Sequence, residues 1–178
     1  MKESEVSIGL SNPKSPENVG SVMRAAGNYR VSSVFYTGQR YLRALKQNPD
    51  TPDTGRRVGQ NIPLNGVSSL IDEAPRKLKI ICIEFAENAI SLPEFQHPDN
   101  AFYIFGPEDG TLSQKIIDES DAVVYIPTVG CMNLAATVNV VLYDRLAKMS
   151  AGDVSLDFND NELIRKSRDR NNNLKVKI

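Results

Sequence analysis

Short apolar runs alternate with helix-like segments along most of this chain, and that alternation limits the fold more than any other feature. The runs expected to be strands are residues 6–10, 31–37, 79–85, 101–105 and 122–126. Near-continuous apolar strands suit a sheet that is covered on both faces. Strands that alternate with helices form mainly parallel sheets. We therefore predict an α/β fold with a mainly parallel sheet and helices on both faces.

The segments between these runs supply the helices and one long loop. Helices are expected at residues 18–29, 41–47, 67–74, 111–120 and 133–149, with Asn18 as the cap of the first. The Pro-, Gly- and Asn-rich stretch 48–63 is typical of a loop. From residue 151 the chain turns polar. We predict a single domain over residues 1–150 and a polar, mobile tail over residues 151–178.

Charge is unevenly distributed along the chain. The net charge is −1, which counts mildly against a nucleic-acid partner. However, residues 24–57 carry seven cations against two acids, and residues 164–178 carry six against one. A local basic surface is therefore compatible with a near-neutral molecule. The alternative is that these charges are solvated helix faces and loops.

Membrane, secreted and metal-dependent classes receive no support. No apolar run approaches the roughly 18 residues that a membrane span needs, and the charged N-terminus is unlike a secretion signal. We expect a cytoplasmic protein whose distant Cys82 and Cys131 are reduced. His97 is the only histidine, so neither a metal site nor a Cys–His nucleophile pair is expected.

The first of three unusual loops opens the helix expected at residues 18–29. Asn18 and Gly20 lie at its entrance, and Arg24 follows Asn18 by nearly two helical turns. We expect Asn18 and Arg24 to face one cleft at the end of the sheet, where a helix entrance favours anions. The alternative is a capped surface helix with a solvent-facing arginine.

The other two loops also follow strand candidates. Gly106 comes directly after an apolar run and allows close approach to the backbone; Glu108 then lies beside a helix start, so it is either a site residue or an acidic cap. In the third loop, Gly130 builds a tight connection and Asn133 either caps the next helix or holds the loop. Exposed backbone groups in such a loop can recognise an adenine.

Taken in order, these segments resemble the motifs of one family. The chain resembles the SpoU, or TrmH-like, branch of the SPOUT RNA methyltransferases at that family's three motifs. The matching segments are Asn18-x-Gly20-x-x-x-Arg24, the run Phe-Gly-Pro-Glu that ends at Glu108, and Ile-Pro followed by the run Cys-Met-Asn-Leu that begins at Cys131. The resemblance covers residues 5–149. It implies an α/β sheet with a C-terminal trefoil knot, S-adenosylmethionine as methyl donor, and methylation of a ribose 2′-hydroxyl of RNA. It also implies a homodimer whose site joins motif 1 of one subunit with motifs 2 and 3 of the other.

The resemblance also assigns roles to residues. Those expected to surround S-adenosylmethionine, largely through backbone groups, are Ile83, Gly106, Ile126, Cys131 and Leu134. Arg24 is the expected catalytic residue. Because guanidinium is very hard to deprotonate, we expect it to hold an RNA phosphate and stabilise the developing oxyanion. Asn18 would position Arg24 or the ribose, and Glu108 and Asn133 would fix the geometry of the site.

The chain differs from the family pattern at two positions of the third motif. Cys131 and Ala135 stand where the family often has serine, which puts hydroxyl contacts there in question.

One alternative function is a non-catalytic RNA- or nucleotide-binding module of the same fold. A dinucleotide-dependent enzyme would need a Gly-x-Gly-x-x-Gly turn, which the sequence lacks. The absence of an added RNA-binding domain favours a compact substrate such as tRNA slightly over ribosomal RNA.

Overall fold

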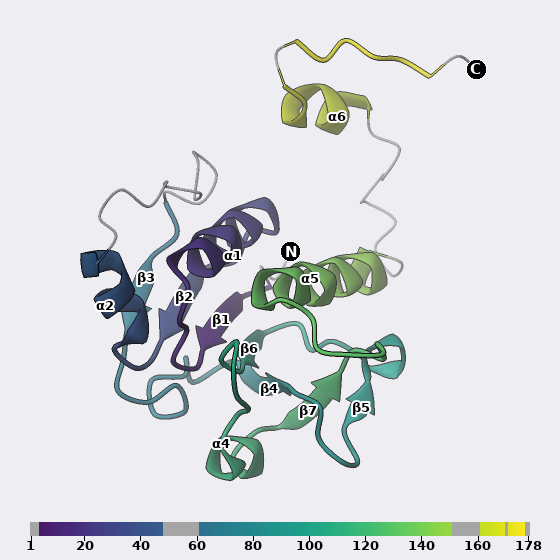
Figure 1. The fold of residues 1–178 in the computed structure, drawn as a ribbon. Coiled ribbons are helices and arrows are strands. Elements are labelled where there is room, and N and C mark those ends of the chain that lie inside the picture. The colour runs from purple at the N-terminus through teal and green to yellow at the C-terminus, as the bar shows by residue number, and fades with distance from the viewer. Residues whose placement is uncertain (1–3, 48–60, 151–160, 170, 177–178) are drawn as a thin grey trace.

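A seven-stranded parallel sheet forms the centre of the molecule (Figure 1). The computed structural model describes residues 4–47, 61–150, 161–169 and 171–176. The strand order is β3-β2-β1-β6-β4-β7-β5, and every neighbouring pair is parallel. The strands are β1 (Val6–Leu10), β2 (Ser33–Tyr36), β3 (Leu64–Gly66), β4 (Lys79–Ile83), β5 (Ile90–Ser91), β6 (Ala101–Phe105) and β7 (Ala122–Tyr125). The α/β prediction is confirmed.

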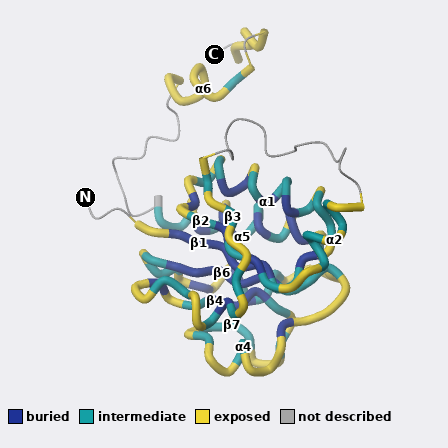
Figure 2. The backbone as a smooth tube through the Cα atoms, turned by 90° about the vertical axis from the view of Figure 1, so that its left-hand side faces the viewer, coloured by how far each residue is buried: buried dark blue, intermediate teal, exposed yellow. Residues whose placement is uncertain are grey.

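Helices cover both faces of this sheet, as the apolar runs indicate. The helices are α1 (Pro16–Asn28), α2 (Arg40–Gln47), α4 (Gln114–Asp118), α5 (Leu134–Ser150) and α6 (Asn161–Ser167), and η1 (Leu92–Glu94) is a 3₁₀ turn. On β6, Tyr103 and Phe105 pack in the core cluster that contains α1 and α5. Phe102 and Ile104 belong to the opposite cluster, against which α4 packs. The fully buried β6 therefore supplies both cores, and Figure 2 shows β1 and β6 dark blue between covering segments.

The first helix begins earlier than its sequence suggests. Ser15, not Asn18, is the N-cap, and its side chain accepts a hydrogen bond from the Asn18 backbone N at 3.1 Å. Pro16 occupies the first turn, where its fixed φ and missing N–H cost nothing. The prediction of Asn18 as the cap is wrong. Its side chain is instead available for contacts with other segments.

Several other element predictions need correction. Residues 67–74 form turns rather than the expected helix. There Ser69 Oγ accepts from the Asp72 backbone N at 3.2 Å, a local bond that competes with helix formation. The short strands β3 and β5 were not predicted. Within the predicted loop 48–63, residues 48–60 lie outside the described residues.

The C-terminal features are only partly described. The predicted tail contains α6, whose described residues are exposed, while residues 151–160 lie outside the described part of the chain. The trefoil knot that the resemblance implies stays a prediction, as does the division at residue 150. Among the described residues, no helix has the length and apolar character needed to cross a membrane.

Candidate active site

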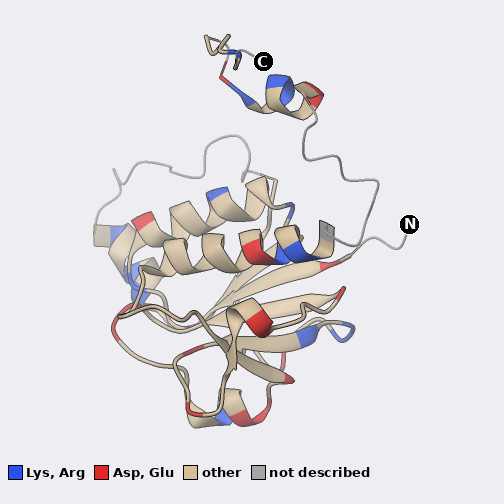
Figure 3. Ribbon diagram, turned by 90° about the vertical axis from the view of Figure 1, so that its right-hand side faces the viewer, with Lys and Arg blue, Asp and Glu red and all other residues tan. Residues whose placement is uncertain are grey.

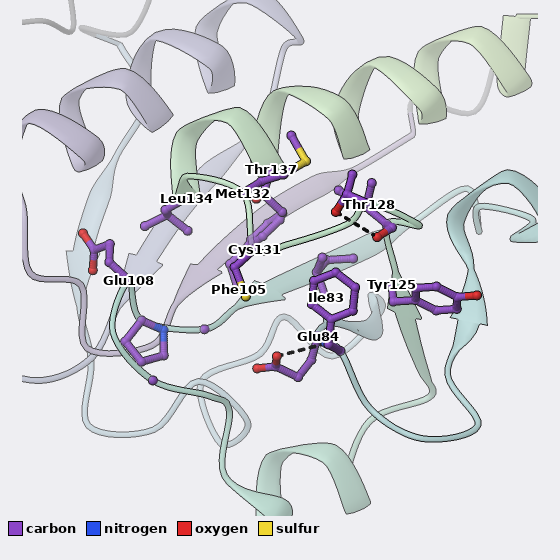
Figure 4. A pocket seen from close by; sticks show the side chains of 15 residues that line it. Ile83, Glu84, Phe105, Glu108, Tyr125, Thr128, Cys131, Met132, Leu134 and Thr137 are labelled. Carbon is purple, nitrogen blue, oxygen red and sulfur yellow. Dashed lines mark hydrogen bonds between the residues drawn. The ribbon is translucent and has the colours of Figure 1, made fainter.

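A cavity opens where the carboxyl ends of three adjacent strands meet (Figure 4). Parallel sheets place their ligand sites at this edge. The cavity encloses about 690 Å³, including its solvent-open mouth. Its lining residues are Ile83, Glu84, Phe85, Phe105, Gly106, Pro107, Glu108, Gly110, Tyr125, Ile126, Thr128, Cys131, Met132, Leu134 and Thr137.

The five residues expected around the cofactor all lie in this lining. Ile83 ends β4, Gly106 follows β6, and Ile126 follows β7. Cys131 and Leu134 come from the connection between β7 and α5 and from the first residue of that helix. Because β6, β4 and β7 are neighbours in the sheet, their carboxyl ends deliver these residues to one place. The second and third sequence motifs thus converge on a single cavity.

Glu108 joins this cavity to the loop before α1. Its Oε2 accepts from the Lys14 backbone N at 2.9 Å, and its Oε1 accepts from the Ser15 backbone N at 3.0 Å and from Asn18 Nδ2 at 3.1 Å. Burial raises the pKa of Glu108, but these hydrogen bonds lower it more, so its pKa lies below the ordinary value. Glu108 is therefore an ionised acceptor that holds the entrance of α1.

Asn18 and Asn133 extend this connection to the third motif. Asn133 Nδ2 donates to Asn18 Oδ1 at 2.9 Å, and Asn133 Oδ1 accepts from the backbone N of Ala135 at 2.9 Å and of Ala136 at 3.3 Å. Asn133 therefore caps α5, one of the two roles that the sequence left open. The hydrogen bonds from Asn18 to Glu108 and from Asn133 to Asn18 link all three motifs within one polypeptide, although the motifs lie far apart in the sequence.

Arg24 lies apart from this network. Its side chain is exposed on α1, and it does not line the cavity. Among the described residues it has no hydrogen-bond or ion-pair partner. Residues six apart on a helix differ by about 600°, or 240° beyond one full turn, and so point to different sides. Asn18 and Arg24 do not both line the described cavity of one chain, so the expectation that they face one cleft stays a prediction.

Glu84 is a site residue that the sequence analysis missed. Its Oε1 accepts from the Phe85 backbone N at 3.0 Å, and its Oε2 accepts from the Leu112 backbone N at 2.8 Å, so the carboxylate connects the end of β4 to the loop between β6 and α4. A Cβ at Gly106 would stand 3.2 Å from Glu84 Oε2 and 3.5 Å from the Leu112 backbone N. The signal in the sequence was a charged residue placed directly after an apolar strand.

The cavity lining combines apolar side chains with a few polar groups, as sites for small organic ligands do. Ile83 and Leu134 supply apolar surface, and Glu84 supplies an acceptor beside it. Gly106 lines the cavity without a side chain, and a Cβ there would crowd Glu84 and Leu112. Within the described ranges, no cluster of three or more His, Cys, Asp or Glu side chains has the arrangement of a metal site.

The two cysteines have opposite surroundings. Cys131 is exposed in the cavity lining. Cys82 is buried in the core on the α4 side, and burial raises its pKa to about 11. At neutral pH Cys82 is a protonated thiol, so Cys131 is the reactive cysteine of the pair.

A second polar cluster ties the far end of α5 to the segment before β6. His97, with a side chain that is 1% exposed, lies 2.6 Å from the Tyr103 hydroxyl and 2.9 Å from Asp144 Oδ2. Arg145 donates to the backbone carbonyl oxygens of Pro98 at 2.5 Å and Asp99 at 2.6 Å. Burial lowers the pKa of His97, and this outweighs the opposing effect of Asp144. His97 is therefore a structural residue.

Comparison with known proteins places this geometry in a family context. The profile of the SpoU rRNA Methylase family matches residues 5–143. The tRNA (cytidine-2′-O-)-methyltransferase TrmJ of Methanocaldococcus jannaschii is 28% identical over 80% of this chain and 68% of its own. A putative TrmH family tRNA/rRNA methyltransferase of Staphylococcus epidermidis is 27% identical over 77% of this chain. This chain covers only 56% of that relative.

Solved structures share the fold at lower identity. The SpoU methyltransferase AviRb of Streptomyces viridochromogenes, solved in complex with AdoMet, superposes with a TM-score of 0.66, 20% identity and coverage of 85% of this chain and 60% of its own. The A. aeolicus TrmH/SpoU tRNA modifying enzyme gives a TM-score of 0.68 at 16% identity, over 92% of this chain and 85% of its own. Because the family match includes every strand of the sheet and all three motifs, the chain belongs to the SpoU rRNA Methylase family.

Proposed function

We propose that this protein transfers a methyl group from S-adenosylmethionine to a ribose 2′-hydroxyl of RNA. The observation that carries the proposal is the convergence of the second and third motifs on one cavity, with the first motif hydrogen-bonded to both. Family membership supports it, as does the similarity to a relative named as a tRNA (cytidine-2′-O-)-methyltransferase. The catalytic unit in this proposal is a single domain over residues 1–150.

The residues proposed to hold S-adenosylmethionine are Ile83, Gly106, Ile126, Cys131 and Leu134, which line the cavity. The bound donor supplies an electrophilic methyl carbon on a sulfonium centre. Ile83 and Leu134 would enclose apolar parts of the ligand and exclude water. The backbone beside Gly106 would approach it closely, because no side chain intervenes. Cys131 would contribute a small side chain where the family often has a serine.

Acceptor activation is the task that we assign to Arg24. In this transfer the 2′-oxygen would bond to the methyl carbon while the bond from that carbon to sulfur breaks and leaves a neutral thioether. The hydroxyl proton would pass to solvent, so partial negative charge would develop on the oxygen that Arg24 faces. An arginine that is exposed and unpaired among the described residues can reach an RNA phosphate and this oxygen together. Arg24 does not line the cavity of its own chain. The proposal therefore includes a homodimer in which Arg24 serves the cavity of the partner.

Asn18, Glu108 and Asn133 have a supporting role in this proposal. Their hydrogen bonds fix the start of α1 relative to the cavity, which in turn fixes where the remainder of α1 presents Arg24. Positioning of this kind supplies much of the acceleration in a transfer that requires in-line alignment. We further propose tRNA as the acceptor and the cytoplasm as the location, where Cys82 and Cys131 would stay reduced.

The decisive experiment is labelled-methyl transfer to total tRNA and to ribosomal RNA, followed by mapping of the modified nucleotide. Arg24→Ala is expected to keep affinity for S-adenosylmethionine and lose turnover by roughly 100- to 1,000-fold, the usual effect of removing one oxyanion donor. Arg76→Ala is the matched control, because Arg76 is exposed and precedes β4, at the amino-terminal ends of the strands and away from the cavity. Cofactor binding without methyl transfer to either RNA would favour a non-catalytic binding module. Unchanged turnover in Arg24→Ala would remove Arg24 from its role.

A further inference from the structure

Helix α2 presents a row of cations to solvent. Tyr41 and Leu42 pack against the core, and the Tyr41 ring meets the Tyr36 ring edge-on with centroids 5.2 Å apart. These contacts orient the helix, so Arg43 and Lys46 are exposed on its outer side. Neither has an ion-pair partner among the described residues. The two positions are three residues apart, which places their side chains on neighbouring parts of one face.

This row begins at the rim of the cavity. Helix α2 follows β2, so it starts at the same edge of the sheet as the cavity. Arg40 Nη2 lies 2.7 Å from Asp109 Oδ2, and Lys14 Nζ lies 3.6 Å from the same oxygen. Asp109 stands between Glu108 and Gly110, both of which line the cavity. Figure 3 shows blue segments along α2, next to the start of the grey trace.

Cations outnumber acids along this row, although the ionised Glu108 lies next to Asp109 and accepts from the Lys14 backbone N. Asp109 is the only acid paired with the row among residues that the structure describes, and the hydrogen bond from Arg40 holds the pKa of Asp109 below its usual range. One carboxylate thus faces Arg40 and Lys14, while Arg43 and Lys46 remain unpaired. Exposed ion pairs contribute little stability, so an incoming phosphate can take Arg40 from Asp109 at small cost.

We propose that the α2 row, defined as Arg40, Arg43 and Lys46 together with Lys14, binds backbone phosphates of the RNA substrate and leads the strand to the cavity rim. This inference rests on the proposed function for the identity of the partner. The row spans about 9 Å along the helix from Arg40 to Lys46. Long flexible side chains on such a span suit successive phosphates of one strand, without reading base sequence. The ion pair between Asp109 and Arg40 lowers the affinity of the row for phosphate, because Arg40 must leave Asp109 to bind RNA.

The test is the salt dependence of binding to fluorescently labelled total tRNA, measured by anisotropy between 50 and 300 mM KCl. The logarithm of the binding constant falls as log [KCl] rises, and each lost phosphate contact makes this negative slope shallower by about 0.7 to 0.9. The double variant Arg43→Gln/Lys46→Gln is therefore expected to make the slope shallower by about 1.4 to 1.8. Arg76→Gln/Lys77→Gln, which removes two exposed cations at the opposite edge, should leave it unchanged. Asp109→Asn, which releases Arg40, should tighten binding and steepen the slope.

The outcomes separate this inference from the proposed function. An unchanged slope in Arg43→Gln/Lys46→Gln, in protein with wild-type thermal unfolding and wild-type affinity for S-adenosylmethionine, overturns the α2 row even if methyl transfer is observed. An equal loss in Arg76→Gln/Lys77→Gln also overturns it, since the effect would then be one of net charge. A selective loss of slope supports the row even if neither tRNA nor ribosomal RNA is methylated.

Discussion

The Glu108→Gln substitution tests the connection between the motifs most directly, because it removes a charge and almost no volume. Glu108 Oε1 accepts two hydrogen bonds, from the Ser15 backbone N and Asn18 Nδ2, and Oε2 accepts one from the Lys14 backbone N. A glutamine can keep its carbonyl oxygen at the Oε1 position. Its amide NH₂ then faces the Lys14 N–H, so two donors oppose each other.

The size of the effect follows from this count. One charge-assisted hydrogen bond is lost, at about 1.5–3 kcal/mol, and two become neutral, at about 1 kcal/mol each. Glu108 is only half-buried, and the Lys14 N–H can turn to water, so the sum must be reduced. We expect a loss of about 2 kcal/mol in the free energy of unfolding. With a urea m-value of about 2 kcal/mol/M, the midpoint falls by about 1 M.

Urea unfolding at pH 7 and pH 3 provides the assay, with Glu94→Gln, an exposed glutamate of η1, as control. The pKa of Glu108 is lower in the folded state than in the unfolded state. Its contribution is therefore complete above the unfolded pKa of about 4.3 and is lost as the pH falls through the folded pKa. The difference between wild type and Glu108→Gln should shrink at pH 3. Equal midpoints at pH 7, or a difference that persists fully at pH 3, would refute the reasoning.

Three further predictions concern the rest of the chain. Because burial lowers the pKa of His97, the unfolded state binds a proton at this histidine more readily than the folded state does. The free energy of unfolding should therefore fall as the pH is lowered from 7 to 5, by up to about 1.4 kcal/mol per pH unit. His97→Gln should reduce this pH dependence, and an equally steep dependence in the variant would contradict the assignment. N-ethylmaleimide should modify Cys131 but not Cys82, with S-adenosylmethionine slowing the reaction as followed by mass spectrometry; equal modification with and without the ligand would place the ligand elsewhere. Gly106→Ala should weaken S-adenosylmethionine binding in calorimetry by about 1–3 kcal/mol, because the new Cβ would stand 3.2 Å from a Glu84 oxygen and displace that lining carboxylate; wild-type affinity would show that the position of Glu84 does not affect the ligand site.

The central strands could be predicted from sequence because the physics that forms them is local and visible. The runs at β1, β4, β6 and β7 are apolar over nearly their whole length, as a sheet covered on both faces requires. The outer strands β3 and β5 are only three and two residues long, and part of β3 is exposed. They exist because a neighbouring strand offers hydrogen bonds, which no local pattern reveals.

The site divides in the same way between local and long-range information. The cavity-lining loops carry recognisable glycines and prolines after apolar strands, so their positions could be read directly. The partners of Asn18 could not, because Glu108 and Asn133 lie 90 and 115 residues away. Ser15 competed with Asn18 for the cap position, and Pro16 decided the outcome. Glu84 was overlooked because its role depends on Leu112, which belongs to another loop.

Helix α5 is fastened at its first turn by Asn133 and at its far end by Arg145, which holds the carbonyl oxygens of Pro98 and Asp99. A helix anchored twice cannot slip by one 5.4 Å turn without breaking both attachments. The loop before α5 has no such long-range attachment at Gly130, where no atom lies within 4 Å of a Cβ built on its backbone. This wall of the cavity should therefore keep its position relative to the sheet, so substitutions at Asn133 or Arg145 should alter the shape of the cavity more than substitutions at Gly130.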